Sequence, residues 1–399
     1  MRLLHTSDWH LGRGFHGFGL LDAQRAFVDH LVDVVRAEDI DAVLVSGDVF
    51  DRALPPVEAI ELLQDALLRL SEHAQVILTS GNHDQPRRLA YGGPMFERAG
   101  VHLRTTVADL SRPVLLAARG TTAAIYGVPF LEPVTQARAL ATDEQPVARS
   151  HESVLAAAMR RIATDRSSRA VDRAVVMSHA WFANSAVRTD EMASASEIDV
   201  SVGGIGIAPA TLVDGFDYAA LGHLHRPQAL DHHVRYSGSA LPYSFSERAV
   251  PKQTLVVDLS AVRPAITEIP TPVHRPLVEL ADNLEHLLHS EVYAHAEQSF
   301  VRILLTDPEL QVQPMAKLRA RFPYAAELVV LATRGTMAAP DAVRSMTTVD
   351  VCDAFLAAVR NEPADEWERA RINDALVAAR RTDEGDDCVH ADDEPEVTA

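Results

Sequence analysis

The sequence Ala74-Gln75-Val76-Ile77-Leu78-Thr79-Ser80-Gly81-Asn82-His83-Asp84 decides the fold of this chain. Residues 74–79 form a short apolar run, rich in β-forming side chains and bounded by turn residues, which predicts a buried strand. Gly81 allows the backbone to turn sharply, and three polar side chains follow at once. Because α/β proteins carry their sites at the carboxyl ends of strands, the stretch predicts a strand that ends in a site. Asn, His and Asp also occur in ordinary turns, so the tetrapeptide needs support from the rest of the chain.

The residues before this stretch repeat the arrangement twice. An extended segment over 1–6 runs into Asp8 and His10, and an apolar run over 41–46 ends in Gly47-Asp48. Helical patterns of apolar residues lie between these strands, over 22–37 and 57–72. The first 85 residues therefore read strand, helix, strand, helix, strand, which predicts an α/β fold with helices on the faces of a sheet.

Two later predicted strands also end in histidine. The strand over 174–177 leads to His179, and the strand over 217–221 leads to His223 and His225. Between and after them we expect a hairpin over 113–118 and 123–128, a helix over 151–164, and strands over 235–239 and 253–258. The segment 183–206 is poor in periodicity and rich in Ser, Gly and Ala, and we expect a long loop that contacts substrate.

Prolines 264, 270, 272 and 276 mark a domain boundary near residue 272. Beyond it the pattern reads strand, helix, strand, helix, strand, which is enough for a small α+β domain. We expect domains over 1–271 and 272–338, two C-terminal helices within 339–382, and a disordered acidic tail over 383–399.

The two C-terminal helices carry apolar residues at helical spacing. These are Val349, Cys352, Phe355, Leu356 and Val359 in the first helix, over 348–361, and Trp367, Ile372, Leu376 and Val377 in the second, over 364–381. Two interpretations stay open. The stripes pack on each other or on the small domain, or they dock onto a helix of a partner protein.

The charge of the chain limits what it binds alone. The 399 residues carry a formal net charge of −19, and the tail holds eight acids and no Lys or Arg. An acidic chain is not the expected profile of a DNA binder that acts alone, so a basic partner surface would help it. Apolar runs stay below the roughly 18 residues of a membrane span, the N-terminus lacks a signal peptide, and two cysteines make no disulfide framework. We therefore expect a cytoplasmic protein without a membrane contact.

Five strand ends thus offer histidine, carboxylate or amide groups to one edge of the fold. Asp8 and His10, like His223 and His225, are two residues apart, which places both side chains on one side of an extended chain. Imidazole ligands suit Mn, Fe or Zn better than Mg or Ca. The number of donors exceeds the need of one metal ion, and two ions with a shared carboxylate, about 3.5–4 Å apart, fit better.

The motifs Asp-x-His, Gly-Asp, Gly-Asn-His-Asp, a single His and Gly-His-x-His, in this order, resemble those of the calcineurin-like metallophosphoesterases. More narrowly, residues 5–12, 47–51, 222–228 and 236–239 resemble the SbcD family, the nuclease subunits of bacterial SbcCD exonucleases. The resemblance extends to about residue 381. It implies a metallophosphoesterase β-sandwich flanked by helices, a small α+β capping domain that binds DNA, and C-terminal helices that bind the SbcC ATPase.

The resemblance also implies roles for the motif residues. One metal ion would be held by Asp8, His10, Asp48 and His225, and the other by Asp48, Asn82, His179 and His223. Asp48 is expected to be the only carboxylate placed to bridge. His83 would stabilise charge or protonate the leaving oxygen at the scissile phosphate, oriented by Asp84. The expected cofactors are two Mn²⁺ ions, with Mg²⁺ or another divalent metal as alternatives, and they would activate a water molecule.

For activity, the resemblance implies a 3′ to 5′ exonuclease on duplex DNA and an endonuclease on single strands and hairpins. Its place would be DNA repair, recombination and replication, as a homodimer within a heterotetramer with SbcC. The loops beside the motifs carry four arginines that are candidates for DNA phosphate contacts or plain solvated charges: Arg13, Arg52, Arg87 and Arg88.

Two other functions remain as alternatives. The first is a metallophosphoesterase that acts on a nucleotide or phosphoprotein; the C-terminal elements, which such an enzyme does not require, argue against it. Residues 47–52 also resemble a protein phosphatase motif, but Ala53 stands where that motif has Gly. The second is a non-catalytic scaffold, which is disfavoured because every metal-ligand position is filled. Histidines outside the motifs, His5 among them, are interpreted as surface or packing residues.

Overall fold

The computed structural model describes residues 1–143, 145–184, 206–309, 311–331, 346–360 and 362–386. The chain forms two compact units. One consists of Met1–Leu304 and Gln313–Val329, and the other of Leu305–Val312 and Val330–Ala399. The domain boundaries expected near residues 272 and 339 stay predictions. The loop expected over 183–206 lies almost wholly outside the described residues.

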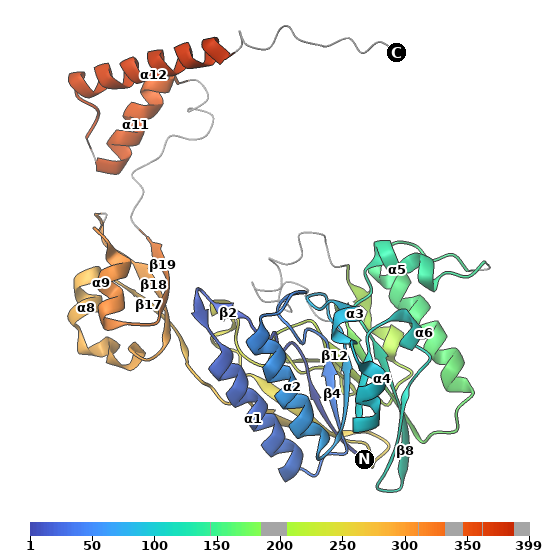
Figure 1. Cartoon of the computed structure of the whole chain (residues 1–399). Coiled ribbons are helices and arrows are strands. Elements are labelled where there is room, and N and C mark those ends of the chain that lie inside the picture. The colour runs from blue at the N-terminus through green and yellow to red at the C-terminus, as the bar shows by residue number, and fades with distance from the viewer. Residues whose placement is uncertain (144, 185–205, 310, 332–345, 361, 387–399) are drawn as a thin grey trace, which may run out of the picture. The chain divides into compact units, whose positions relative to one another are not determined.

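The first sheet contains the three strands of the N-terminal pattern. Its order is β16 (Ala265–Pro270), β15 (Gln253–Asp258), β1 (Arg2–Thr6), β4 (Ala42–Ser46), β5 (Gln75–Thr79) and β6 (Val101–Arg104). The strands β1, β4, β5 and β6 are parallel, and β15 is antiparallel to both of its neighbours. Helices α1 (Leu21–Ala37) and α2 (Val57–Ser71) lie side by side on this half of the unit (Figure 1). The predicted alternation of strands and helices is thus confirmed.

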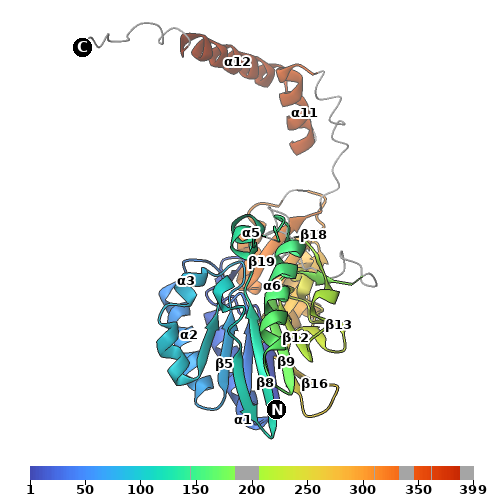
Figure 2. The same ribbon diagram turned by 90° about the vertical axis from the view of Figure 1, so that its right-hand side faces the viewer.

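The second sheet also has six strands. Its order is β13 (Gln228–Asp231), β14 (Val234–Tyr236), β12 (Tyr218–Gly222), β9 (Arg173–His179), β8 (Thr121–Val128) and β7 (Val114–Ala118). Helices α5 (Pro133–Leu140) and α6 (His151–Ser167) pack beside it (Figure 2). The predicted hairpin turns at Arg119 and Gly120, whose φ angles of 52° and 73° suit a two-residue type I′ turn.

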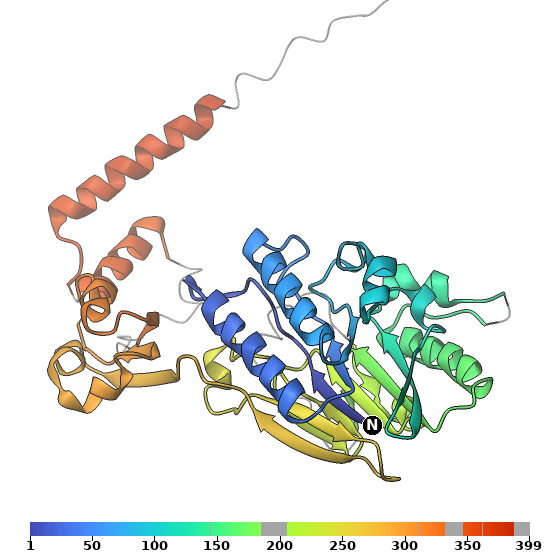
Figure 3. The same cartoon turned by 60° about the horizontal axis from the view of Figure 1, so that its bottom comes forward.

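The two sheets pack face to face as a sandwich. Alternate residues of the strands point into the layer between them: Leu3, Leu44 and Ile77 of the first sheet pack in one core cluster with Val175 and Tyr218 of the second. The intervening residues pack against the helices in two further clusters. Strands buried on both faces read as continuous apolar runs, which explains why residues 41–46 and 74–79 show no alternation. Figure 3 shows β15 and β16 at the edge of the first sheet, in yellow.

A small three-stranded sheet follows the sandwich. It contains β17 (Leu277–Asp282), β18 (Phe300–Leu305) and β19 (Ala325–Val330), with helices α8 (Leu284–His289) and α9 (Pro314–Arg321) between the strands. The order of elements is the predicted one. Phe300 joins this sheet to the first core, because its ring lies 5.0 Å from the ring of Phe15 and 5.5 Å from that of Phe18.

The two C-terminal helices belong to the second compact unit. They are α11 (Thr348–Arg360) and α12 (Glu366–Asp386), so the second helix continues four residues into the predicted acidic tail, and 387–399 lie outside the described residues. The Asp353 carboxylate of α11 connects the two helices. It accepts a hydrogen bond from the amide of Ala364, at 2.7 Å, and forms an ion pair with Arg369 of α12. Among the helices that the structure describes, none is long and apolar enough to cross a membrane.

Candidate metal centre

Polar side chains from five strand ends meet at one edge of the sandwich. Asp8 and His10 follow β1, Asp48 follows β4, and Asn82, His83 and Asp84 follow β5. His179 ends β9, and His223 and His225 follow β12, so the second sheet contributes as well. Possible metal-binding atoms form three overlapping groups, and the atoms within each group lie within 4.8 Å of one another. The groups are Asp8, His10 and His225; His10, Asp48 and His83; and Asp8, Asp48 and His179. The fold therefore brings five of the predicted ligands together: Asp8, His10, Asp48, His179 and His225. His223 and Asn82 belong to none of these groups, whereas His83, which was not expected to be a ligand, belongs to one.

The loops after β1 and β4 run side by side. The amide of Asp8 donates to the Gly47 carbonyl oxygen, and the amide of His10 to the Asp48 carbonyl oxygen, each at 3.0 Å. Asp8, His10 and Asp48 have positive φ angles of 52°, 46° and 48°, and His223 has 103°. Left-handed backbone is uncommon in residues other than Gly and collects at functional sites. The left-handed backbone at these four residues directs their side chains toward the same small space.

The glycines of the motifs make room for these loops. A Cβ atom on Gly81 would lie 2.0 Å from Asp48 Oδ1, and one on Gly222 would lie 1.9 Å from the Ser46 carbonyl oxygen. The chain bends at Asn82, His83 and Asp84, directly after Gly81, although Gly81 itself has no positive φ. Glycine is needed at position 81 because the Asp48 side chain packs directly against the backbone there.

Asp48 lies at the centre of the site. Its Oδ2 is 3.4 Å from His179 Nε2, 3.7 Å from His10 Nε2 and 4.0 Å from His83 Nε2. Burial alone would raise the pKa of this carboxyl group, but the surrounding histidines hold it well below its usual value. Asp8 also belongs to two of the three donor groups. The expectation that Asp48 alone bridges therefore stays a prediction, and Asp8 is the second carboxylate to compare with it.

The histidines present ring nitrogens to the same space. His10 Nε2 and His225 Nε2 lie 3.0 Å apart, and the His179 and His223 ring centroids are 5.3 Å apart. Burial lowers the pKa of His10 well below its usual value and that of His223 to about 3, so both rings are neutral, the form that binds metals. Although burial opposes it, Asp48 raises the pKa of His179 to about 9. The neutral imidazoles of His10 and His223, beside two buried carboxylates, form a donor set that fits divalent metal ions.

Asn82, His83 and Asp84 point in three directions. Asn82 Oδ1 lies 3.0 Å from His179 Nε2, inside the donor cluster. His83 Nδ1 donates to the Asp51 carbonyl oxygen at 2.7 Å, and its side chain stays 17% exposed. Asp84 accepts from the amides of the Asp48 loop and of its own turn: Val49 at 3.1 Å, Phe50 at 2.9 Å and Gly81 at 2.9 Å.

The prediction that Asp84 orients the His83 ring is thus wrong. The carboxylate points toward the amides of Val49 and Phe50, in the loop after β4. Burial, with help from Asp48, raises the pKa of Asp84 to about 6, against the effect of the three amides. Asp84 fixes the Asp48 loop, and the Asp51 carbonyl oxygen orients His83.

The four candidate arginines lie in the segments after β1, β4 and β5 and differ in exposure. Arg13 Nη1 lies 3.6 Å from Asp51 Oδ1, and its guanidinium is 4.9 Å from the centre of the Tyr243 ring. Arg52 pairs with the same carboxylate at 3.7 Å while its side chain is 63% exposed. Arg87 and Arg88 are exposed on the short helix α3 (Pro86–Leu89), and Arg88 donates to the Ala53 carbonyl oxygen.

Several supporting residues were missed from the sequence. Gln24 of α1 is buried, donates to the His10 carbonyl oxygen at 2.8 Å and accepts from the Gly12 amide at 3.1 Å. The Tyr243 hydroxyl donates to the Trp9 carbonyl oxygen at 2.5 Å. The sequence does indicate a role for Gln24. This residue lies on the apolar face of its helix, where a buried polar side chain needs a hydrogen-bond partner.

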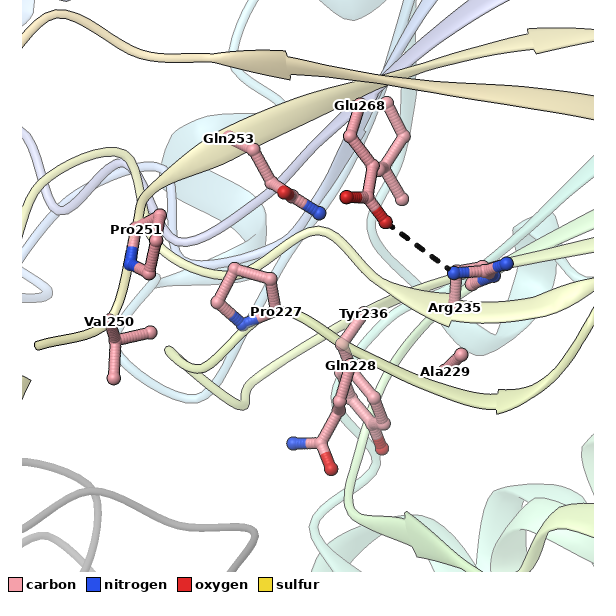
Figure 4. A pocket seen from close by; sticks show the side chains of 10 residues that line it. Pro227, Gln228, Ala229, Arg235, Tyr236, Val250, Pro251, Gln253 and Glu268 are labelled. Carbon is pink, nitrogen blue, oxygen red and sulfur yellow. Dashed lines mark ion pairs between the residues drawn. The ribbon is translucent and has the colours of Figure 1, made fainter.

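A cavity of about 200 Å³ opens elsewhere, between the segments that follow β12 and precede β15 (Figure 4). Arg235 of β14 and Glu268 of β16 line it and pair at 3.8 Å, so this ion pair joins the two sheets. Its lining residues do not include the predicted metal ligands. The candidate site is therefore the donor cluster at the strand ends and not this cavity.

Comparison with known proteins agrees with this geometry. The sequence profile of the calcineurin-like phosphoesterase family matches residues 1–227, and the chain belongs to that family. It is accordingly a hydrolase of phosphoester bonds, as predicted. Among individual proteins, it is similar to the SbcD subunit of the nuclease SbcCD from Staphylococcus saprophyticus, with 28% identity over 331 residues, 81% of this chain and 83% of that protein. This similarity confirms the resemblance that the motifs indicated.

Two solved structures are also similar. TT1561 of Thermus thermophilus has 13% identity and a TM-score of 0.39, over 67% of this chain and 98% of that one. GAP50, the anchor in the inner membrane complex of Plasmodium, has 11% identity and a TM-score of 0.38, over 84% of this chain and 99% of that one. At such scores neither structure bears on the function.

Proposed function

We propose that this chain is a metal-dependent DNA nuclease, the counterpart of SbcD in an SbcCD-type complex. It would hydrolyse phosphodiester bonds as a 3′ to 5′ exonuclease on duplex ends and as an endonuclease on single strands and hairpins. The observation that carries the proposal is the convergence of five strand ends on one buried donor cluster. The similarity to the staphylococcal SbcD protein along most of both chains supports the choice of DNA as substrate.

The proposed cofactors are two Mn²⁺ ions, with Mg²⁺ or another divalent metal as alternatives. Asp8, His10, Asp48 and His225 would hold one ion, and Asp48, Asn82, His179 and His223 the other. The overlap of the donor groups at Asp48 supports a shared ligand. When bound, two divalent ions lower the pKa of a water molecule and offset the charge of the phosphate.

His83 is the proposed catalytic residue of the chain itself. A carbonyl oxygen only accepts hydrogen bonds, so the contact with Asp51 places a proton on His83 Nδ1. The ring then presents Nε2 toward the donor cluster, 4.0 Å from Asp48. A second proton on Nε2 would stabilise charge on the phosphate or pass to the leaving oxygen. Asp84 would act indirectly, by fixing the Asp48 loop.

DNA would approach over the arginines beside His83. Arg52, Arg87 and Arg88 are exposed, and Arg13 lies between Asp51 and Tyr243. Guanidinium groups at the mouth of a phosphoesterase site suit contacts to phosphates on either side of the cleaved bond. The small domain over 272–338 would cap this surface, in a cytoplasmic enzyme of DNA repair, recombination and replication.

Exposed apolar side chains support the proposed assembly, a homodimer within a heterotetramer with the SbcC ATPase. Four of them lie around the start of α2, between α3 and α4, and on α4 (Gly93–Phe96): Leu54, Val57, Tyr91 and Met95, exposed by 69%, 65%, 84% and 76%. Arg88 of α3 donates to the Ala53 carbonyl oxygen and so connects α3 with the segment before α2. Phe355 and Trp367, on α11 and α12, are 64% and 70% exposed. Apolar side chains gathered on such surfaces suit protein contacts.

The proposal is tested by comparing substrates. The purified chain is incubated with Mn²⁺ and duplex DNA, single-stranded DNA or p-nitrophenyl phosphate, with EDTA as the control. We expect Mn²⁺-dependent cleavage of both DNAs. Hydrolysis of p-nitrophenyl phosphate without cleavage of either DNA would favour a phosphatase acting on a nucleotide or phosphoprotein. Metal binding without hydrolysis of any substrate would favour a scaffold.

Deletion of residues 341–399 separates the nuclease from its proposed partner contact. We expect the truncated chain to fold, bind metal and cleave short DNA with Mn²⁺, because the donor cluster lies within residues 8–225. ATP-stimulated cleavage with SbcC should disappear, since the deletion removes the exposed Phe355 and Trp367 of α11 and α12. The measurements are co-purification with SbcC and ATP-dependent cleavage. Undiminished affinity for SbcC would contradict the docking role.

A further inference from the structure

Glu247 and Lys252 form a buried ion pair directly behind His225. Lys252 Nζ lies 2.6 Å from Glu247 Oε2, and the two side chains are 5% and 0% exposed. Glu247 ends the short helix η5 (Phe245–Glu247), and Lys252 precedes β15 by one residue, far in sequence from His225. Two charges removed from water are costly unless each is fully paired and hydrogen-bonded. The contacts of each partner therefore indicate what the pair does.

The ammonium group of Lys252 uses all of its protons. It donates to Glu247 Oε2, to the His225 carbonyl oxygen at 2.7 Å and to Ser239 Oγ at 2.8 Å. An ammonium group has three donors, so this environment is saturated. One of the three acceptors is the backbone of a proposed metal ligand, so the lysine ties the His225 loop to the segment before β15.

The carboxylate of Glu247 reaches the ring of the same histidine. Its Oε1 lies 3.6 Å from His225 Nδ1, while Oε2 faces Lys252 and accepts from the Tyr243 amide at 3.3 Å. On the other side of the ring, His225 Nε2 points into the donor cluster, 3.0 Å from His10 Nε2. The Glu247 carboxylate therefore lies beside Nδ1 of the His225 ring, and the proposed metal site lies beside Nε2.

The composition of the chain adds to this observation. Lysine and arginine together number 37, yet lysine occurs at positions 252 and 317 alone. Nearly all positive charge of the chain is arginine, and one of its two lysines lies in this buried ion pair. Three acceptors gathered around one point suit a compact ammonium group, whereas a planar guanidinium fork spreads its donors apart.

We propose that Glu247 and Lys252 are positioning residues for His225, which fix its ring with the Nδ1 proton toward Glu247 and Nε2 toward the donor cluster. The inference rests on the proposed metal site and adds residues that the ligand motifs do not contain. A carboxylate behind a metal-binding histidine fixes its tautomer and orientation and raises its basicity. Lys252 holds both the carboxylate and the loop that carries the ring.

The test measures Mn²⁺ binding to the full-length chain without any measurement of catalysis. Free Mn²⁺ is followed by electron paramagnetic resonance during a titration, for Glu247→Gln, Lys252→Met and the double variant. The double variant removes both charges at once, so no buried charge is left unpaired. Lys317→Met, a change of the exposed lysine on α9, is the matched control. Thermal unfolding of the metal-free proteins is recorded in parallel.

We expect one of two Mn²⁺ affinities to fall by about 10–100-fold in Glu247→Gln and in the double variant, since residues behind metal ligands have effects of this size. The other affinity should match that of Lys317→Met. Lower thermal midpoints with both affinities unchanged would show that the pair only stabilises the core, and would overturn the inference. A wild-type chain that binds no Mn²⁺ would overturn the proposed metal site itself, an outcome distinct from the first.

Discussion

The His83→Ala variant is expected to bind two metal ions and to lose most of its activity. His83 Nε2 lies 4.0 Å from Asp48, but unlike the fully buried His10 and His179 its side chain remains 17% exposed. A ring that faces both the donor cluster and solvent is placed to meet a substrate. Loss of a general acid or of electrostatic stabilisation costs about 10²–10⁴-fold in rate. The measurements are Mn²⁺ bound per chain and the rate of DNA cleavage.

His289→Ala, an exposed histidine on α8, is the control and should keep both properties. His83 shares a donor group with His10 and Asp48, so its geometry also allows a ligand role. Anomalous scattering distinguishes the two roles. A metal ion absent from His83→Ala but present in the control would make His83 a ligand, contrary to our proposal.

The Asp48→Ala variant is expected to lose both metal ions and all metal-dependent cleavage. Asp48 lies within 4.0 Å of ring nitrogens of His10, His83 and His179, and its pKa is held low by these rings although burial raises it. Removing it takes a charged ligand from both proposed positions at once. By contrast, His10→Ala should weaken mainly one position. Titration of bound Mn²⁺ per chain measures both effects.

Asp8 is the informative comparison for this prediction. It also belongs to two donor groups, so Asp8→Ala tests whether a second carboxylate is shared. Asp29→Ala, a half-exposed aspartate on α1 that pairs with Arg69, is the control. Equal metal losses in Asp48→Ala and His10→Ala would count against a bridging role of Asp48.

The sequence predicted those parts of the fold that depend on local pattern. The strands β1, β4, β5, β9 and β12 end in the predicted motifs, because apolar runs and the polar residues after them are both visible in the chain. The strand β16 was missed, since Pro264 and Pro270 were interpreted as a boundary. Proline is tolerated at the ends of a strand at the edge of a sheet, and β16 is such a strand.

The supporting contacts of the site could not be predicted in the same way. Glu247 and Lys252 approach His225 only because β15 pairs with β1 and returns the chain to the site. The direction of Asp84 depends on amides of the Asp48 loop, 34 and 35 residues earlier. Such contacts are fixed by tertiary packing, whereas the ligands themselves stand in short motifs.

The division of the donors between two sheets has a consequence for folding. Asp8, His10, Asp48 and Asn82 follow strands of the first sheet, and His179, His223 and His225 follow strands of the second. Metal ions bound by residues of both sheets would link the two sheets at the edge where these strands end. Ligands that bind only the folded chain stabilise it by mass action, so a chelator would act on this protein as a mild denaturant. The availability of metal in the cell would then set the lifetime of the chain as well as its activity.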